Sequence, residues 1–180
     1  MTPQEYIQLK AFARQDGALL SLLWIGGFAC YIKGLTNPLL GLASLLLIIL
    51  SPFFAANRLR HFRDEARDGI ISFRRAYAYI VLSFFYAGLL LAVVLFVYFN
   101  FIDDGFLLGQ FTQKFNTTEG QQALQMYGLK EQMVQGLKDL AEMRPIDYAL
   151  NMLTFNIITG FLLGIPIALL MHRTVAAPKL

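Results

Sequence analysis

Four long stretches of this chain contain no charged residue, and they constrain its fold more than any other feature. They comprise residues 17–32, 34–57, 76–102 and 148–171. A helix rises about 1.5 Å per residue, so about 20 apolar residues cross the hydrocarbon core of a bilayer. The last three stretches are long enough to span. The first covers only about 24 Å, so it requires local thinning of the bilayer or a Lys33 side chain that reaches the interface.

The composition agrees with this interpretation. Hydrophobic residues make up 57% of the 180 residues and charged residues 15%, against about 25% charged in ordinary soluble domains. So few charges could not cover so much apolar surface in water. We therefore predict an all-α fold with one polytopic membrane domain over residues 1–180 and an amphipathic outer helix between the third and fourth spans. The transmembrane helices are predicted at about 17–32, 39–57, 76–102 and 148–171.

The distribution of the cations predicts the orientation. With both termini in the cytoplasm, ten cations lie inside and five outside, which follows the positive-inside rule. The inner ten are Lys10, Arg14, Arg58, Arg60, Arg63, Arg67, Arg74, Arg75, Arg173 and Lys179. The outer five are Lys33, Lys114, Lys130, Lys138 and Arg144. We predict a bacterial inner-membrane protein with cytoplasmic termini, a cytoplasmic basic loop at 58–75 and an outer loop at 103–147.

The outer loop contains the pattern of an amphipathic helix. Thr118 and Gln121 have the spacing of a capping box. Apolar residues then recur every three or four positions, at Met126, Leu129, Met133, Leu137 and Leu140. Such a helix lies on the outer leaflet, covers the helix ends or binds another protein. Glycines at 120, 128 and 136 weaken it and leave its boundaries open.

The second transmembrane helix is predicted to continue into the cytoplasm as far as about Gly69. Arg60 and Asp64, and likewise His61 and Glu65, are four residues apart and can pair on one helix face. Because Pro is favoured in the first turn of a helix, Pro38 and Pro145 mark the starts of the second and fourth helices. Residues 1–16 lie on the inner leaflet or continue into the first helix.

Six arginines in the basic loop are the candidate lipid- or anion-binding residues: Arg58, Arg60, Arg63, Arg67, Arg74 and Arg75. Each cation near a membrane surface contributes about 1 kcal/mol of attraction to anionic headgroups. They could bind anionic lipid or a lipid-linked phosphate. The alternative is that they only fix the topology.

The fourth helix carries two features of its own. Gly160 and Gly164 have the small-xxx-small spacing that lets two helices approach closely, within the monomer or in a dimer. Its outer half also carries four polar residues, which form interhelical hydrogen bonds or line a polar pathway. These four are Asn151, Thr154, Asn156 and Thr159.

The sequence shows no constellation of catalytic or metal-binding residues. None of the four predicted spans contains Asp, Glu, Lys, Arg or His in its interior, which argues against an ion-coupled carrier. His61 and His172 are far apart in sequence, and only Glu65 lies at a ligand-like spacing from either. We predict no enzymatic activity, no cofactor, no metal and no nucleic-acid partner.

A short motif resembles a known family. Arg67-Asp68-Gly69 is followed by Ile70-Ile71-Ser72-Phe73 and Ala76, and Asn100-Phe101-Ile102-Asp103 comes after the third span. The pattern Gly-x-x-Ser/Thr-Phe-x-x-Ala, within a chain similar from about Phe12 to Met171, resembles the uncharacterised bacterial four-helix inner-membrane family called domain of unknown function 4199. Arg74 and Asp104 depart from that pattern. The resemblance implies the same topology and, as partners, lipid-linked glycosyltransferases.

Two functions follow as expectations. The first is a non-enzymatic accessory or scaffold subunit that holds partners through the basic loop and the outer helix. The alternative is a small flippase-like carrier or helper for a lipid-linked sugar phosphate. The expected partners are membrane lipids, anionic or polyprenyl-phosphate, and a membrane protein such as a glycosyltransferase.

Overall fold

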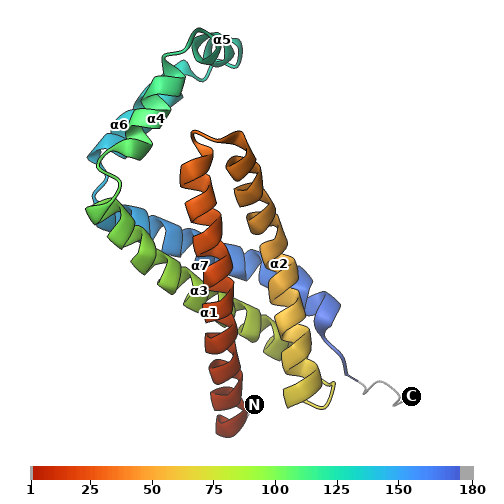
Figure 1. The fold of residues 1–180 in the computed structure, drawn as a ribbon. Helices are drawn as coiled ribbons and strands as arrows, with labels where there is room; N and C mark the ends of the chain where they lie inside the picture. The colour runs from red at the N-terminus through yellow and green to blue at the C-terminus, as the bar shows by residue number, and fades with distance from the viewer. Residues whose placement is uncertain (1, 175–180) are drawn as a thin grey trace.

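The computed structural model describes residues 2–174, which form seven helices (Figure 1). Lys179, one of the ten predicted inner cations, lies outside the described residues. The helices are α1 (Pro3–Gly34), α2 (Pro38–Ala66), α3 (Phe73–Phe101), α4 (Phe106–Phe115), α5 (Thr118–Met126), α6 (Lys130–Glu142) and α7 (Pro145–Met171). The described residues are 86% helical and contain no strand, so the all-α prediction is confirmed.

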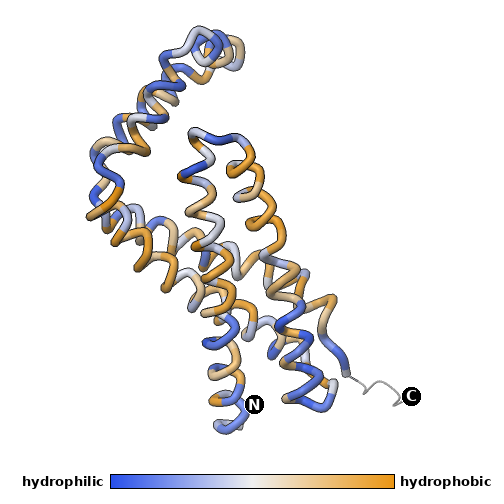
Figure 2. Tube along the Cα trace, viewed as in Figure 1, coloured by the Kyte–Doolittle hydropathy of each residue, from blue (hydrophilic) through white to orange (hydrophobic). Residues whose placement is uncertain are grey.

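Four of the helices, α1, α2, α3 and α7, are long and apolar enough to cross a membrane. Their most apolar windows have mean hydropathies of 1.4, 2.4, 2.8 and 2.1. Figure 2 shows their apolar residues in the middle of the bundle and hydrophilic residues at the end near the N-terminus and along the outer helices. The chain is therefore an integral membrane protein with four transmembrane helices.

The ends of these helices follow local sequence signals. Pro38 and Pro145 are the first residues of α2 and α7, as predicted. The Asn37 side chain accepts a hydrogen bond from the Leu39 amide at 3.1 Å, which caps one of the amides that a helix start leaves free. Thr2 caps α1 in the same way, so residues 3–16 continue directly into the first transmembrane helix.

The extension of α2 beyond the apolar stretch is also confirmed. The helix continues to Ala66, and the pairs Arg60–Asp64 and His61–Glu65 have nitrogen–oxygen distances of 3.6 and 3.0 Å. Gly69 has a positive φ of 78°, and its amide donates to the Arg63 carbonyl at 3.0 Å. This geometry is typical of a helix C-terminus, where glycine adopts the left-handed conformation without strain.

Glycines set how closely the long helices pack. Gly17 of α1 faces α3, where an added Cβ would lie 2.7 Å from the Ser83 carbonyl oxygen. Gly160 and Gly164 of α7 also face α3: a Cβ at Gly160 would lie 2.7 Å from Phe84 Cβ. Helix α1 packs along α2 and α3, and α3 along α7, whereas α2 and α7 meet only over a short contact. The bundle is therefore two hairpins joined mainly through α1 and α3.

The outer segment differs from the prediction of one long helix. Residues 103–144, which we call the arm, contain three short helices that project beyond the turn between α1 and α2 (Figure 1). The predicted capping box at Thr118 was wrong. Thr117 is the N-cap and accepts from the Gly120 amide at 3.0 Å, while the Gln121 side chain donates to the Phe115 carbonyl. Gly128, with a positive φ of 64°, separates α5 from α6.

Candidate functional site

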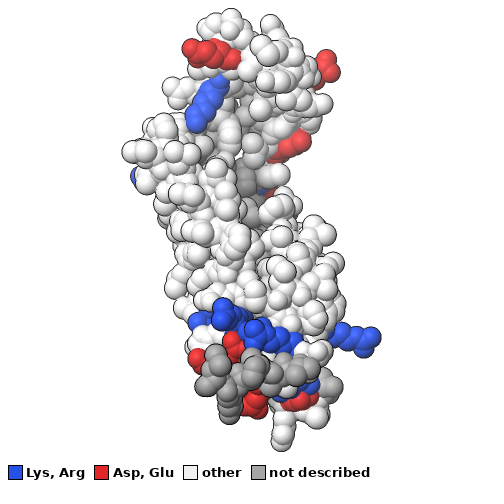
Figure 3. Space-filling view, turned by 90° about the vertical axis from the view of Figure 1, so that its right-hand side faces the viewer, with Lys and Arg blue, Asp and Glu red and all other residues white. Residues whose placement is uncertain are grey.

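Charged side chains from α1, α2 and α3 pair with one another at the end of the bundle that carries the N-terminus, which we call the basic end. Figure 3 shows charges gathered at this end and on the arm, with a largely uncharged middle. The pairs join residues far apart in sequence, so they connect the helices to one another. They are the first of two candidate sites.

Asp16 is the most deeply placed of these charges. Its side chain is only 3% exposed. Arg58 Nε of α2 donates to Asp16 Oδ1 at 2.6 Å, and the Tyr79 hydroxyl of α3 donates to Oδ2. The Phe62 ring stacks on Tyr79 with centroids 5.0 Å apart. Asp16 lies just before the first charge-free stretch, so it is outside the four predicted spans, and packing against α2 and α3 buries it.

Glu5 forms a second link. Arg67 Nη2 donates to Glu5 Oε1 at 3.0 Å, and Arg75 Nη2 donates to Oε2. One carboxylate thus joins the first turn of α1 to the loop after α2 and the start of α3. Glu5 lies before the apolar stretch of α1. The Thr2 amide, together with the nearby Arg75 guanidinium, lowers the pKa of the Glu5 carboxyl.

Arg63 ties α2 to the end of α7. It is 3% exposed. Its Nη1 donates to the Met171 carbonyl at 2.9 Å, and its Nε and Nη2 donate to both carboxylate oxygens of Asp64 at 2.7 and 3.0 Å. The Met171 carbonyl is among those that a helix end leaves without an intrahelical partner. Arg63 therefore caps α7 from a neighbouring helix.

The six arginines predicted to bind lipid thus fall into two groups. Arg58, Arg63, Arg67 and Arg75 are buried or half-buried and pair within the chain. Arg60 and Arg74 are exposed, and Arg60 is also 3.6 Å from Asp64. The structure brings the first four together as links between helices and leaves two at the surface.

The second candidate site is a cavity of about 550 Å³ between the two hairpins, on the side of the arm. All four long helices line it, together with α4 and α6 of the arm. Trp24 and Phe84 pack edge to face at 5.3 Å, and the stacked rings of Phe99 and Tyr148 lie 4.0 Å apart, all four in the lining. This volume lies within the range of about 300–1,000 Å³ that is typical of small-molecule binding sites.

Polar groups in the cavity wall are few, and three of them already donate a hydrogen bond within the chain. The hydroxyls of Ser44, Ser51 and Tyr148 donate to backbone carbonyls at 2.7–2.9 Å. Asn156 differs from these three, because its amide is buried without a partner. It is 6% exposed, and its Nδ2 has no hydrogen-bond partner among the described residues.

The four polar residues predicted on the last helix therefore fall into two pairs with different surroundings. Asn156 and Thr159 line the cavity, whereas Asn151 and Thr154 are exposed and lie outside its lining. Helical periodicity places residues 156 and 159 on one face. What the sequence did not reveal is that Asn156 Nδ2 is buried without an acceptor.

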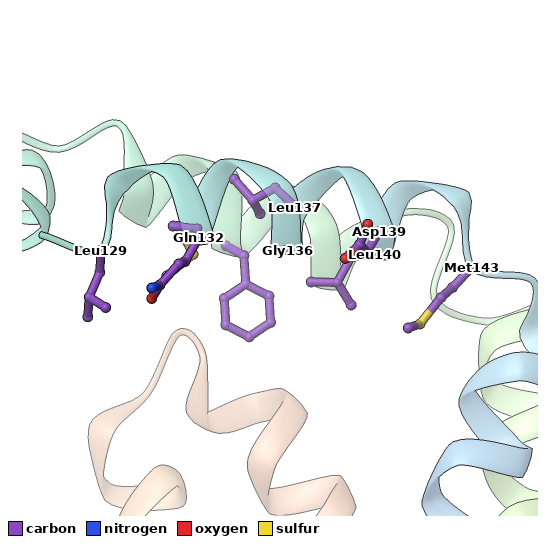
Figure 4. A pocket seen from close by; sticks show the side chains of 9 residues that line it. Leu129, Gln132, Gly136, Leu137, Asp139, Leu140 and Met143 are labelled. Atoms are coloured by element: carbon purple, nitrogen blue, oxygen red, sulfur yellow. The ribbon is translucent and has the colours of Figure 1, made fainter.

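A groove of about 510 Å³ lies under the arm. Figure 4 shows Leu129, the N-cap residue of α6, together with Gln132 and Leu140 of α6, extending toward the turn between α1 and α2. Phe111 and Leu140 line both this groove and the cavity. The two hollows therefore share one stretch of arm wall.

The described residues contain no group of three His, Cys, Asp or Glu side chains close enough to hold a metal ion. The single cysteine, Cys30, is half-buried in α1 and forms no disulfide. The two candidate sites therefore offer hydrogen-bonding groups and apolar surface to a ligand or partner.

Comparisons with known proteins give one match. No curated protein and no solved structure matches this chain. The sequence profile of one family matches residues 15–173, which is most of the 180 residues. This confirms the resemblance drawn from the Gly69–Ala76 motif: the chain belongs to the family described as "Protein of unknown function (DUF4199)".

Proposed function

We propose that this protein is a non-enzymatic accessory subunit of the bacterial inner membrane that holds a second membrane protein through its arm. One observation carries the proposal: the arm buries almost none of its own apolar side chains. Leu107 is the only buried residue of α4, and α5 and α6 have none among the described residues. Short helices gain most of their stability from packing an apolar face, so the arm requires a surface to cover it.

The charge of the arm favours a protein as that surface. Residues 103–144 carry six acids and four cations, a net charge of −2. They are Asp103, Asp104, Glu119, Glu131, Asp139, Glu142, Lys114, Lys130, Lys138 and Arg144. Amphipathic helices that lie on lipid carry mainly Lys and Arg on the polar face. We therefore assign the apolar face of α6, with Leu129, Met133 and Val134, to an apolar surface of a partner membrane protein.

A glutamate introduced on the apolar face of α6 should weaken binding of the partner protein. We expect Met133→Glu to reduce a stoichiometric co-purifying membrane protein at least tenfold, because a buried unpaired carboxylate is strongly disfavoured in an apolar interface. The measurement is quantitative mass spectrometry of tagged full-length protein from native membranes, with lipid-linked glycosyltransferases as the first candidates.

Gln135→Glu is the matched control. It introduces the same side chain two positions away, on the opposite face of α6, where Gln135 is exposed and bonded only to Asp139. The partner should remain with this variant. If Met133→Glu retains as much partner as wild type, or if wild type holds none, the accessory role is contradicted.

The proposed orientation places the basic end in the cytoplasm, where Arg60 and Arg74 would meet anionic headgroups. We expect Arg60→Gln/Arg74→Gln to lower retention of anionic over zwitterionic lipid at least about fivefold, since each cation contributes about 1 kcal/mol. The difference should shrink with salt, because exposed charges are screened beyond about 10 Å at 0.1 M ionic strength. Native mass spectrometry measures it.

The control for the lipid experiment is Lys114→Gln/Lys130→Gln, which removes the same charge from the arm. Its lipid selectivity should match that of wild type. Equal selectivity in all three proteins would leave topology as the only role of Arg60 and Arg74.

The flippase-like alternative has less support. It requires the basic-loop arginines to bind a phosphate, yet Arg58 and Arg63 are held by partners within the chain. Releasing Arg58 would leave the buried Asp16 carboxylate without its cation, which is costly.

A further inference from the structure

The proposed accessory role does not involve the cavity between the hairpins. In the wall of this cavity, Asn156 Nδ2 is buried without a hydrogen-bond acceptor. Asn156 lies eleven residues into α7, about 16 Å along the helix from its outer end. That depth is near the middle of a hydrocarbon core about 30 Å thick. No water is available there to accept a hydrogen bond from Nδ2, so a ligand oxygen is the remaining acceptor.

The charge of the wall limits what that ligand can be. None of the described residues that line the cavity carries a formal charge. A phosphate or carboxylate headgroup would therefore lose its hydration without gaining a cation. The ligand oxygen belongs to a neutral group, and a carbonyl is the neutral acceptor that amides bind most commonly in proteins.

The aromatic residues of the cavity wall also indicate that the ligand contains a ring. Eight of its nineteen residues are aromatic: Trp24, Phe28, Tyr31, Phe84, Phe99, Phe111, Tyr148 and Phe155. Aromatic side chains prefer offset-stacked or edge-to-face contact with other rings, and such pairs gain energy beyond simple area burial. An acyl chain gains nothing specific from these rings. The ester carbonyl of a lipid acyl chain also stays near the headgroup, far from the depth at which Asn156 lies in the bilayer.

The cavity is open to the bilayer on one side. Ile48 of α2 and Phe155 of α7 both line it, and both are more than half exposed. Because α2 and α7 meet only over a short contact, a ligand can enter between them from the lipid. A long apolar tail can then remain in the bilayer while the ring occupies the cavity.

From the depth, the neutral wall, the aromatic lining and the free Asn156 donor, we infer that this cavity binds a neutral, ring-bearing lipid with a carbonyl oxygen. This is the chemistry of an isoprenoid quinone. Asn156 Nδ2 donates to the carbonyl, and Trp24 and Phe84 contact the ring. The inference concerns binding alone and is independent of the arm's partner.

Trp24 provides a direct test, because it is the single tryptophan of the chain and lines the cavity. Quinones quench tryptophan fluorescence on contact. The full-length protein in phosphatidylcholine nanodiscs is titrated with decylubiquinone while Trp24 emission is recorded. We expect quenching that saturates. Asn156→Leu should weaken binding about three- to tenfold, the range for one lost hydrogen bond, and Thr159→Phe, which places a ring in the cavity beside Asn156, should weaken it further.

Two controls separate ligand binding from folding. Thr154→Leu, on an exposed face of α7 outside the lining, should bind as wild type does. Asn156→Leu without quinone should melt at or above the wild-type temperature, because it removes an unsatisfied buried donor.

A different set of results would overturn the inference. Quenching that rises without saturation, or that is equal in wild type, Asn156→Leu and Thr159→Phe, shows partition into the bilayer only. A second titration uses phosphatidylcholine with brominated acyl chains. Strong quenching of Trp24 by these chains, with no further saturable quenching when decylubiquinone is added, shows that an acyl chain occupies the cavity.

Discussion

Replacing Asp16 with leucine should lower the free energy of unfolding by about 3–5 kcal/mol, the range for breaking a buried ion pair by removing one partner. The substitution leaves the Arg58 guanidinium, whose side chain is 23% exposed, facing an apolar group. It also removes the acceptor of the Tyr79 hydroxyl. Because Asp16 connects α1, α2 and α3 at one point, the loss should affect the whole bundle.

Reversible unfolding in detergent measures this loss. The double variant Asp16→Leu/Arg58→Met should recover most of the stability, since replacing both members of a buried pair by apolar residues is often neutral or stabilising. Glu65→Leu is the matched control, because Glu65 is 67% exposed and pairs only with His61. It should change stability by less than about 0.5 kcal/mol. A loss below about 1 kcal/mol for Asp16→Leu, within that of ordinary surface substitutions, would contradict the structural role of the pair.

Arg63→Gln should give the second large effect, about 1–3 kcal/mol, the cost of leaving a buried polar group without its partner. The group left behind is the Met171 carbonyl at the end of α7, and the shorter glutamine cannot reproduce the three hydrogen bonds of the guanidinium. The last turn of α7 should therefore exchange its amide hydrogens faster, which mass spectrometry detects.

Arg60→Gln is the control for this substitution. Arg60 lies three residues earlier on the same helix, is 66% exposed and makes one long pair with Asp64, so its loss should be below about 0.5 kcal/mol. Equal losses at the two positions would show that Arg63 is not a link between helices. Arg63 had been predicted as one of six candidate lipid-binding arginines.

The four transmembrane helices could be predicted because their signals are local. A charge-free stretch and a proline at position 38 or 145 act within a few residues of the helix they define. The arm was predicted less well. Thr117 and Thr118 are both suitable caps, and only the hydrogen bond to Gly120 distinguishes them. Helix α4 follows a turn in which Gly105 adopts a positive φ, and it was not predicted from the sequence.

The candidate sites were largely hidden for a different reason. Asp16, Arg58 and Tyr79 lie on three helices, and nothing in the sequence states how those helices are rotated against one another. Arg58 had been predicted as a lipid ligand for its charge alone. Asn156 was recognised as a polar residue in an apolar helix, but whether it has a partner depends on what α3 presents to it. That residue is Gly88, which has no side chain to offer.

Phe111 and Leu140 belong to the arm and also form part of the cavity wall. An arm that moves when it engages another protein therefore changes the shape of the cavity. Thermodynamic linkage makes such an effect reciprocal: if occupying one site alters affinity at the other, the factor is the same in both directions. The short length of chain between residues 103 and 107, where Asp103 accepts from the Leu107 amide, is the joint through which this coupling would pass.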